Sequence, residues 1–132
     1  MSFDVPFPAD YGGVIDVFNR VKWFHENGWE VILHCFEYKR QPNIELEKYA
    51  EINYYPRPTG IMHWFSKTPF IVKTRIHKGL ENLLRNTKDE VLLEGLHCSH
   101  YLNLQPGRFY LRTHNIEHDY YAGLAKKAKG LK

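Results

Sequence analysis

The sequence lacks the features that mark secreted and membrane-spanning proteins. No apolar stretch approaches the roughly 18 residues that a transmembrane helix needs, and the first residues lack the charged-then-apolar pattern of a signal peptide. There are only two cysteines, Cys35 and Cys98, and both lie in or beside apolar runs. We therefore expect a cytoplasmic protein with two reduced thiols in its core.

A strong charge of one sign is also missing. The formal net charge is +3 and the pI is near 8.8, which permits contact with phosphates or with an anionic membrane. No dense stripe of Lys and Arg indicates a nucleic-acid partner. Four lysines close the chain, as is typical of a solvated helix end that complements the helix dipole: Lys126, Lys127, Lys129 and Lys132.

Strand and helix patterns alternate along the chain, without internal repeats. This alternation predicts an α/β fold with a Rossmann-like open parallel sheet and helices on both faces, in one domain over residues 1–132. Apolar residues recur at helical spacing over 14–24, after Gly12-Gly13, and Asn27-Gly28 ends that helix. The apolar run at 31–36 is typical of a strand buried on both faces.

The rest of the chain continues the pattern. We expect a short helix at 43–50 and strands at 52–55, 91–93 and 109–111. Thr68 before Pro69 predicts a helix start, and the last helix should begin near residue 116 or 117. The helix after Pro69 carries apolar residues on one side: Ile76, Leu80, Leu83 and Leu84.

The two ends of the chain predict a piece of a longer protein. Only five residues precede the Pro6-Phe7-Pro8 loop, so the first strand would be short. The chain then stops soon after a helix. We expect the parent protein to continue for about 150–200 residues, a second domain.

The first of three candidate loops runs from residue 6 to 13. In an open parallel sheet, ligands bind where strands end and loops lead into helices. Gly12 and Gly13 stand at the mouth of a helix and let a phosphate or sugar approach the backbone closely. The free N–H groups and the positive end of the dipole favour an anion there. A tight turn without a ligand is the alternative for this loop taken alone.

The second loop follows the strand at 91–93. It offers the Glu94 carboxylate, two imidazoles and a thiol, and the spacing of His97 and His100 could hold a metal. Cys98 beside a histidine could also form a nucleophile pair. The alternative is a polar loop with a partly buried cysteine.

The third loop covers residues 112–118. His114 and Asn115 would project into the mouth of the cleft, and Glu117 lies in the first helical turn, where the dipole favours a carboxylate. Alternatively, Asn115 caps the helix and His114 is structural. The pattern His114-x-x-Glu117-His118 also matches the inverzincin zinc peptidases, although a third ligand would have to lie in the 14 residues that follow.

Three stretches together carry a resemblance to a known family: PFPADYGG at 6–13, NGWEV at 27–31 and RTHNIEHDYY at 112–121. The chain resembles the N-terminal, acceptor-side domain of GT-B glycosyltransferases of the large retaining family 4. The match covers both ends and the expected topology, whereas residues 41–88 are unspecific.

The resemblance implies sugar transfer from a nucleotide-sugar donor to a saccharide or lipid-linked acceptor. His114 would be catalytic, through a hydrogen bond to the transferring sugar. A C-terminal domain of the same enzyme would hold most of the donor, so the isolated chain should be inactive. The family needs no bound metal or cofactor. The substrate- and donor-binding residues that we predict are Tyr11, Gly12, Gly13, Glu94, Arg112, Asn115 and Glu117.

Two further hypotheses stay open from the sequence. A noncatalytic Rossmann-like binding module would share the fold without the active cleft, and a zinc hydrolase would use the histidines at 114 and 118. Trp64, Phe65 and Phe70 could form an apolar patch for the acceptor or for peripheral contact with the inner face of a membrane, or they could belong to the core.

Overall fold

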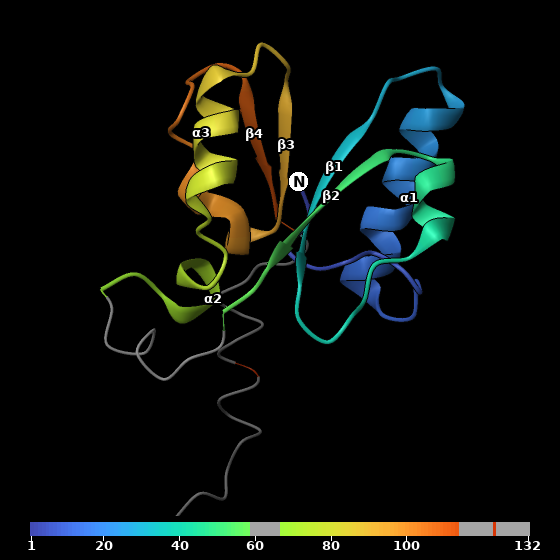
Figure 1. Cartoon of the computed structure of the whole chain (residues 1–132), viewed down its shortest axis with the longest axis horizontal. Helices are drawn as coiled ribbons and strands as arrows, with labels where there is room; N and C mark the ends of the chain where they lie inside the picture. Colours follow the sequence, from blue (N-terminus) through green and yellow to red (C-terminus); the bar gives the residue numbers. More distant parts are fainter. Residues whose placement is uncertain (59–66, 114–122, 124–132) are drawn as a thin grey trace, which may run out of the picture.

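The computed structural model describes residues 1–58, 67–113 and 123 (Figure 1). These residues form an α/β protein with short parallel strands. In chain order its elements are α1 (Gly12–Glu26), β1 (Ile32–Glu37), the 3₁₀ helix η1 (Ile44–Lys48), β2 (Glu51–Pro56), α2 (Phe70–Lys73), α3 (Lys78–Asn86), β3 (Val91–Glu94), the 3₁₀ helix η3 (Leu96–Tyr101) and β4 (Phe109–Arg112).

Helix α1, of 15 residues, lies where the glycines and the apolar spacing predict it. Its buried face presents Val14, Val17 and Val21 to the core. The helix ends at Asn27, whose side-chain amide donates to the Trp23 carbonyl at 2.8 Å. Gly28 follows with φ of 80°, a left-handed conformation that glycine adopts without strain.

The strands pair in parallel, as the alternation of strands and helices predicts. β1 pairs with β2 from Ile32↔Glu51 to Glu37↔Pro56. β3 pairs with β4 from Val91↔Phe109 to Glu94↔Arg112. The near-continuous burial of β1 from Leu33 to Phe36 fits a strand covered on both faces.

The first two residues connect the two strand pairs. On one side, the Ser2 amide donates to the His34 carbonyl at 2.8 Å, and Ser2 forms a parallel bridge with Cys35. On the other side, the Met1 amine donates to the Leu92 carbonyl at 2.7 Å, and the Glu94 amide donates to the Met1 carbonyl at 3.0 Å. The hydrogen-bonded order is therefore β2, β1, residues 1–2, β3 and β4, and Figure 1 shows the N-terminus between β1 and β3.

Helices flank the strands on opposite sides. In Figure 1, α1 lies on the side of β1 and β2, and α3 lies on the other side beside β3 and β4. The core between the strands and these two helices contains Leu33, Leu80, Leu84 and Leu93, each at most 3% exposed. Leu83, expected on the buried side of α3, is instead 48% exposed.

The helix expected to run on from Pro69 is two helices. α2 is only four residues long, and α3 starts at Lys78. Two hydrogen bonds within this segment accompany the break: the Thr74 hydroxyl donates to the Phe70 carbonyl at 3.0 Å, and the His77 ring accepts from the Leu80 amide at 3.2 Å as an N-cap. Residues 43–50 likewise form a 3₁₀ helix rather than an α-helix, with the Asn43 side chain as its cap.

The part of the chain that the structure describes contains no helix with the length and apolar character needed to cross a membrane. Both cysteines are buried free thiols, as the sequence predicts. The expected helix after residue 116 lies outside the described residues.

Candidate functional site

The carboxyl ends of the parallel strands define the candidate site. The first strand segment, residues 1–2, leads into the loop at 4–11, and β1 leads into the loop at 38–43. These two loops face each other across a pocket of about 550 Å³. It is lined by Asp4, Phe7, Pro8, Asp10, Tyr11, Tyr38, Lys39, Arg40, Gln41, Pro42 and Asn43.

Residues 6–13, which end in Gly12 and Gly13, are called the glycine loop, and Arg40 holds this loop in place from the opposite loop. Its guanidinium donates to the Pro8 carbonyl at 2.6 Å, forms a hydrogen-bonded ion pair with Asp10 and lies 3.9 Å from an Asp4 carboxylate oxygen. It also lies over the Tyr11 ring, 5.0 Å from its centroid. The Asp4 carboxylate in turn accepts from the Val5 amide at 2.9 Å. One arginine thereby fixes the loop that leads into α1.

Gly12 and Gly13 have different reasons to be glycine. A Cβ on Gly13 would lie 3.0 Å from the tip of the Phe3 ring, so a larger residue there would require Phe3 to shift, and packing favours glycine. A Cβ on Gly12 would meet nothing within 4 Å, and Gly12 does not have a positive φ. Packing and conformation therefore leave Gly12 unexplained, whereas close approach of a ligand to its backbone would explain it.

The start of α1 is chemically suited to an anion. Tyr11, at the N-cap position, provides no side-chain hydrogen bond to the first turn, and that turn contains no acidic residue. The amides of a 15-residue helix thus begin at an exposed glycine without a capping side chain. Of the predicted residues, Gly12, Gly13 and Tyr11 lie together here.

Tyr11 acts as a hydrogen-bond donor at this edge. It is 44% exposed, and its hydroxyl lies 3.4 Å from an Asp4 carboxylate oxygen. Partial burial, reinforced by the negative charge of Asp4, raises the pKa of Tyr11 to about 12. The phenol therefore stays protonated at neutral pH, and its single O–H can donate either to Asp4 or to a ligand oxygen.

Glu94 and Arg112, both predicted to bind substrate, belong to a charge network with α1. Glu94 is 3% exposed and forms an ion pair of 2.8 Å with Arg20. Arg112 forms a hydrogen-bonded ion pair with Asp16 and lies 3.5 Å from Glu94. The hydrogen bond to Asp16 raises the pKa of Arg112. These charges are matched within the protein, and their predicted binding role stays a prediction.

The same network positions the end of β4. Asp16 lies one turn after Gly12 on α1, and its partner Arg112 is the last residue of β4. The carboxyl end of β4 therefore lies beside the first turns of α1. His114, Asn115, Glu117 and His118 themselves lie outside the described residues, as do Trp64 and Phe65.

The second predicted loop forms η3 and does not assemble a reactive centre. Cys98 is fully buried, which raises the pKa of its thiol to about 11. The His97 ring stacks on Phe3 with centroids 5.0 Å apart, whereas His100 lies 3.4 Å from a carboxylate oxygen of Glu81. Within residues 1–58 and 67–113, no group of three or more His, Cys, Asp and Glu could hold a metal.

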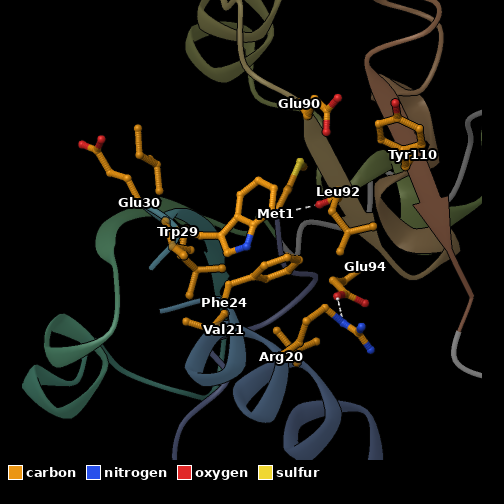
Figure 2. A pocket seen from close by; sticks show the side chains of 14 residues that line it. Met1, Arg20, Val21, Phe24, Trp29, Glu30, Glu90, Leu92, Glu94 and Tyr110 are labelled. Carbon is orange, nitrogen blue, oxygen red and sulfur yellow. Dashed lines mark hydrogen bonds and ion pairs between the residues drawn. The ribbon is translucent and has the colours of Figure 1, made fainter. Parts of the chain in front are cut away.

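A second pocket, of about 300 Å³, lies on the α1 side of the strands (Figure 2). Its walls are mainly apolar, with Phe24 and Val21 of α1 facing Leu92, and the Glu94–Arg20 ion pair lies at one end. Trp29 and Tyr110 at its margin are 58% and 49% exposed. This groove involves the second half of α1, and it is therefore separate from the glycine loop.

Arg40 was not among the residues that sequence reasoning identified. Its contacts reach back about 30 positions to Pro8 and Asp10, and a single arginine in a loop forms no recognisable pattern. Comparison of the chain with protein-family models, with curated proteins and with solved structures finds no match.

Proposed function

We propose that this chain is the acceptor-side, Rossmann-like domain of a nucleotide-sugar-dependent glycosyltransferase of the GT-B type. The observation that carries the proposal is the exposed Gly12 at the uncapped start of α1, where neither packing nor backbone conformation requires a glycine. A donor diphosphate that approaches these amides would require one.

The strand order supports the Rossmann-like fold. From residues 1–2 the chain continues to β1 and β2 on one side, and later to β3 and β4 on the other. The position where the order reverses is the end of the first segment, which leads directly into the glycine loop. In open α/β sheets, ligands bind at this reversal, outside the carboxyl ends of the strands.

In this proposal the described residues bind the donor and orient it. The Gly12 and Gly13 amides and the α1 dipole would stabilise the negative charge of the donor diphosphate, which grows as it leaves the sugar. Arg40 would keep the loop in the conformation that presents these amides. His114, two residues beyond Arg112, would donate to the transferring sugar. A saccharide or lipid-linked acceptor, a C-terminal donor-binding domain and a cytoplasmic location belong to the same proposal.

Amide NMR of the ¹⁵N-labelled chain tests the donor site. UDP-glucose and GDP-mannose are titrated separately, with glucose as a control that lacks the diphosphate. We expect saturable shifts at Tyr11, Gly12 and Gly13, with affinity in the millimolar range because half of the donor site lies in another domain. Gly12→Val should abolish these shifts, since the side chain blocks approach to the backbone.

Lys78→Val is the matched control, because Lys78 is the exposed first residue of α3 as Gly12 is of α1. It should leave the shifts unchanged. If neither nucleotide sugar perturbs the glycine loop of the folded chain at millimolar concentration, the donor site and the proposed function are wrong.

A further inference from the structure

Arg57 lies at the carboxyl end of β2 and is held by contacts that fix its guanidinium plane. The ring of Tyr38 lies 4.8 Å from the guanidinium carbon, and the ring of Phe70 lies 5.9 Å from it. The Nε atom donates to the Thr74 hydroxyl at 3.1 Å. The Arg57 amide also donates to the Glu37 carbonyl at 2.9 Å, which places this residue beside the end of β1.

The two terminal nitrogens of Arg57 have no protein acceptor among the described residues. No carboxylate of that part of the chain forms an ion pair with this side chain, which is half-buried rather than freely solvated. The stacking and the Nε hydrogen bond therefore orient a fork of N–H donors without using it. Such a fork matches two oxygens of a phosphate or carboxylate group.

A second arginine, Arg75, lies near Arg57 and is more deeply buried. Arg75 is 5% exposed, and it donates to the Phe3 and Ile71 carbonyls, each at 2.7 Å. Burial, together with the positive charge of Arg57, lowers the pKa of Arg75 to about 10. No carboxylate of the described residues pairs with it.

Three other arginines of the fold are paired with carboxylates. Arg20, Arg40 and Arg112 each form an ion pair with Asp or Glu. Arg57 and Arg75 thus place two positive charges, unpaired by any carboxylate of residues 1–58 and 67–113, at the same edge as the glycine loop, where Arg75 contacts the backbone of Phe3. A bound anion would relieve the cost of holding these charges together away from water.

We propose that Arg57, with Arg75 behind it, binds a phosphate group of the acceptor. That the ligand is the sugar acceptor rests on the proposed function, whereas the presence of a phosphate site at Arg57 does not. Phosphate is favoured over carboxylate because two neighbouring cations match the charge of a phosphate monoester, about −1.5 to −2, better than a single negative charge. A half-buried Arg57 offers its donors to the ligand, while Arg75 contributes its positive charge from the interior.

NMR of the arginine Nε–Hε groups in the full chain tests this site. Inorganic phosphate and glycerol 3-phosphate are titrated, and the Arg57 signal should shift saturably. Arg57→Gln should weaken binding by about tenfold or more, as expected for loss of a charged hydrogen bond. Arg57→Lys, which keeps the charge but not the fork, should also weaken it. Arg85→Gln removes the same charge from the exposed face of α3 and should change the affinity less than twofold.

Sedimentation with lipid vesicles distinguishes a lipid-linked phosphate from a water-soluble phosphate ester. If the acceptor is lipid-linked, the chain should sediment with phosphatidylcholine vesicles that contain phosphatidic acid, and Arg57→Gln should reduce this sedimentation. If only the soluble phosphates bind, the acceptor is a water-soluble phosphate ester. Equal phosphate affinity in Arg57→Gln and the unmodified chain would overturn the proposal.

The outcomes also separate this site from the donor site. Phosphate binding at Arg57 without any response of Gly12 to nucleotide sugars would keep the phosphate site and reject the glycosyltransferase. A response of Gly12 to nucleotide sugars without phosphate binding at Arg57 would reject the phosphate site alone.

Discussion

Burial sets the protonation state of several side chains that, from sequence alone, look reactive. His34 is 7% exposed, and burial, assisted by the nearby N-terminal amine, lowers its pKa to about 4. Burial raises the pKa of the Cys35 thiol to about 12 and that of Cys98 to about 11. At neutral pH the imidazole is therefore uncharged and both sulfurs remain thiols. These three side chains therefore belong to the core and offer neither a charged imidazole nor a thiolate at neutral pH.

The state of His34 predicts a pH dependence of stability. Between its folded pKa of about 4 and the ordinary histidine value near 6.5, the unfolded chain binds more protons than the folded chain. The free energy of unfolding should therefore fall as the pH falls through this window, by about 2 kcal/mol from pH 7 to pH 5. Urea denaturation at several pH values measures this fall in the free energy of unfolding.

The matching variants isolate the contribution of His34. His34→Gln should flatten the slope of the free energy of unfolding against pH, even if it lowers stability overall. His25→Gln, at an exposed position on α1, should keep the original slope. An unchanged slope in His34→Gln would show that His34 is not buried in its neutral form.

The buried thiols predict very slow labelling. Because the thiolate is the reactive species, both cysteines should resist a disulfide reagent such as DTNB at pH 8 in the folded chain. Both should react within the mixing time in 6 M guanidinium chloride. Rapid labelling of one thiol under native conditions would contradict the burial of that cysteine.

At the scale of elements, the sequence predicted those helices and strands that depend on the spacing of neighbouring residues. The glycines and the apolar spacing of 14–24 located α1, and the apolar runs located all four strands. The break between α2 and α3 was not predictable, because it depends on Tyr101, which follows it by more than 20 residues. The Tyr101 hydroxyl donates to the Arg75 carbonyl at 2.8 Å and accepts from the His77 amide at 2.9 Å.

Tyr101→Phe should therefore destabilise the chain. It leaves two backbone groups at the break without their partner, in a site where Tyr101 is fully buried. We expect a loss of about 1–3 kcal/mol in the free energy of unfolding, measured by urea denaturation. Tyr110→Phe, which removes an exposed hydroxyl, should stay within about 0.5 kcal/mol of the unmodified chain. Equal effects of the two substitutions would contradict the bridging role of Tyr101.

At the scale of the whole molecule, the sequence predicted the parallel pairing of the strands but not the side chains that join the loops at their carboxyl ends. Parallel strands and the glycine loop followed from periodicity and turn chemistry. Arg40 and Arg57 did not, because their contacts join loops that are distant in sequence. The ion pairs of Glu94 with Arg20 and of Arg112 with Asp16 are likewise long-range contacts that no local pattern indicates.

The central claim is that the glycine loop and the segment at residue 114 meet at one edge of a parallel sheet. A nitroxide label on Gly12→Cys tests it, since the two native thiols are buried. Relative to the ascorbate-reduced control, the label should broaden the amide signals of Thr113, His114 and Asn115 strongly, and those of Lys88 and Asp89 at the opposite edge weakly. Strong broadening at 88–89 with sharp signals at 113–115 would contradict the claim.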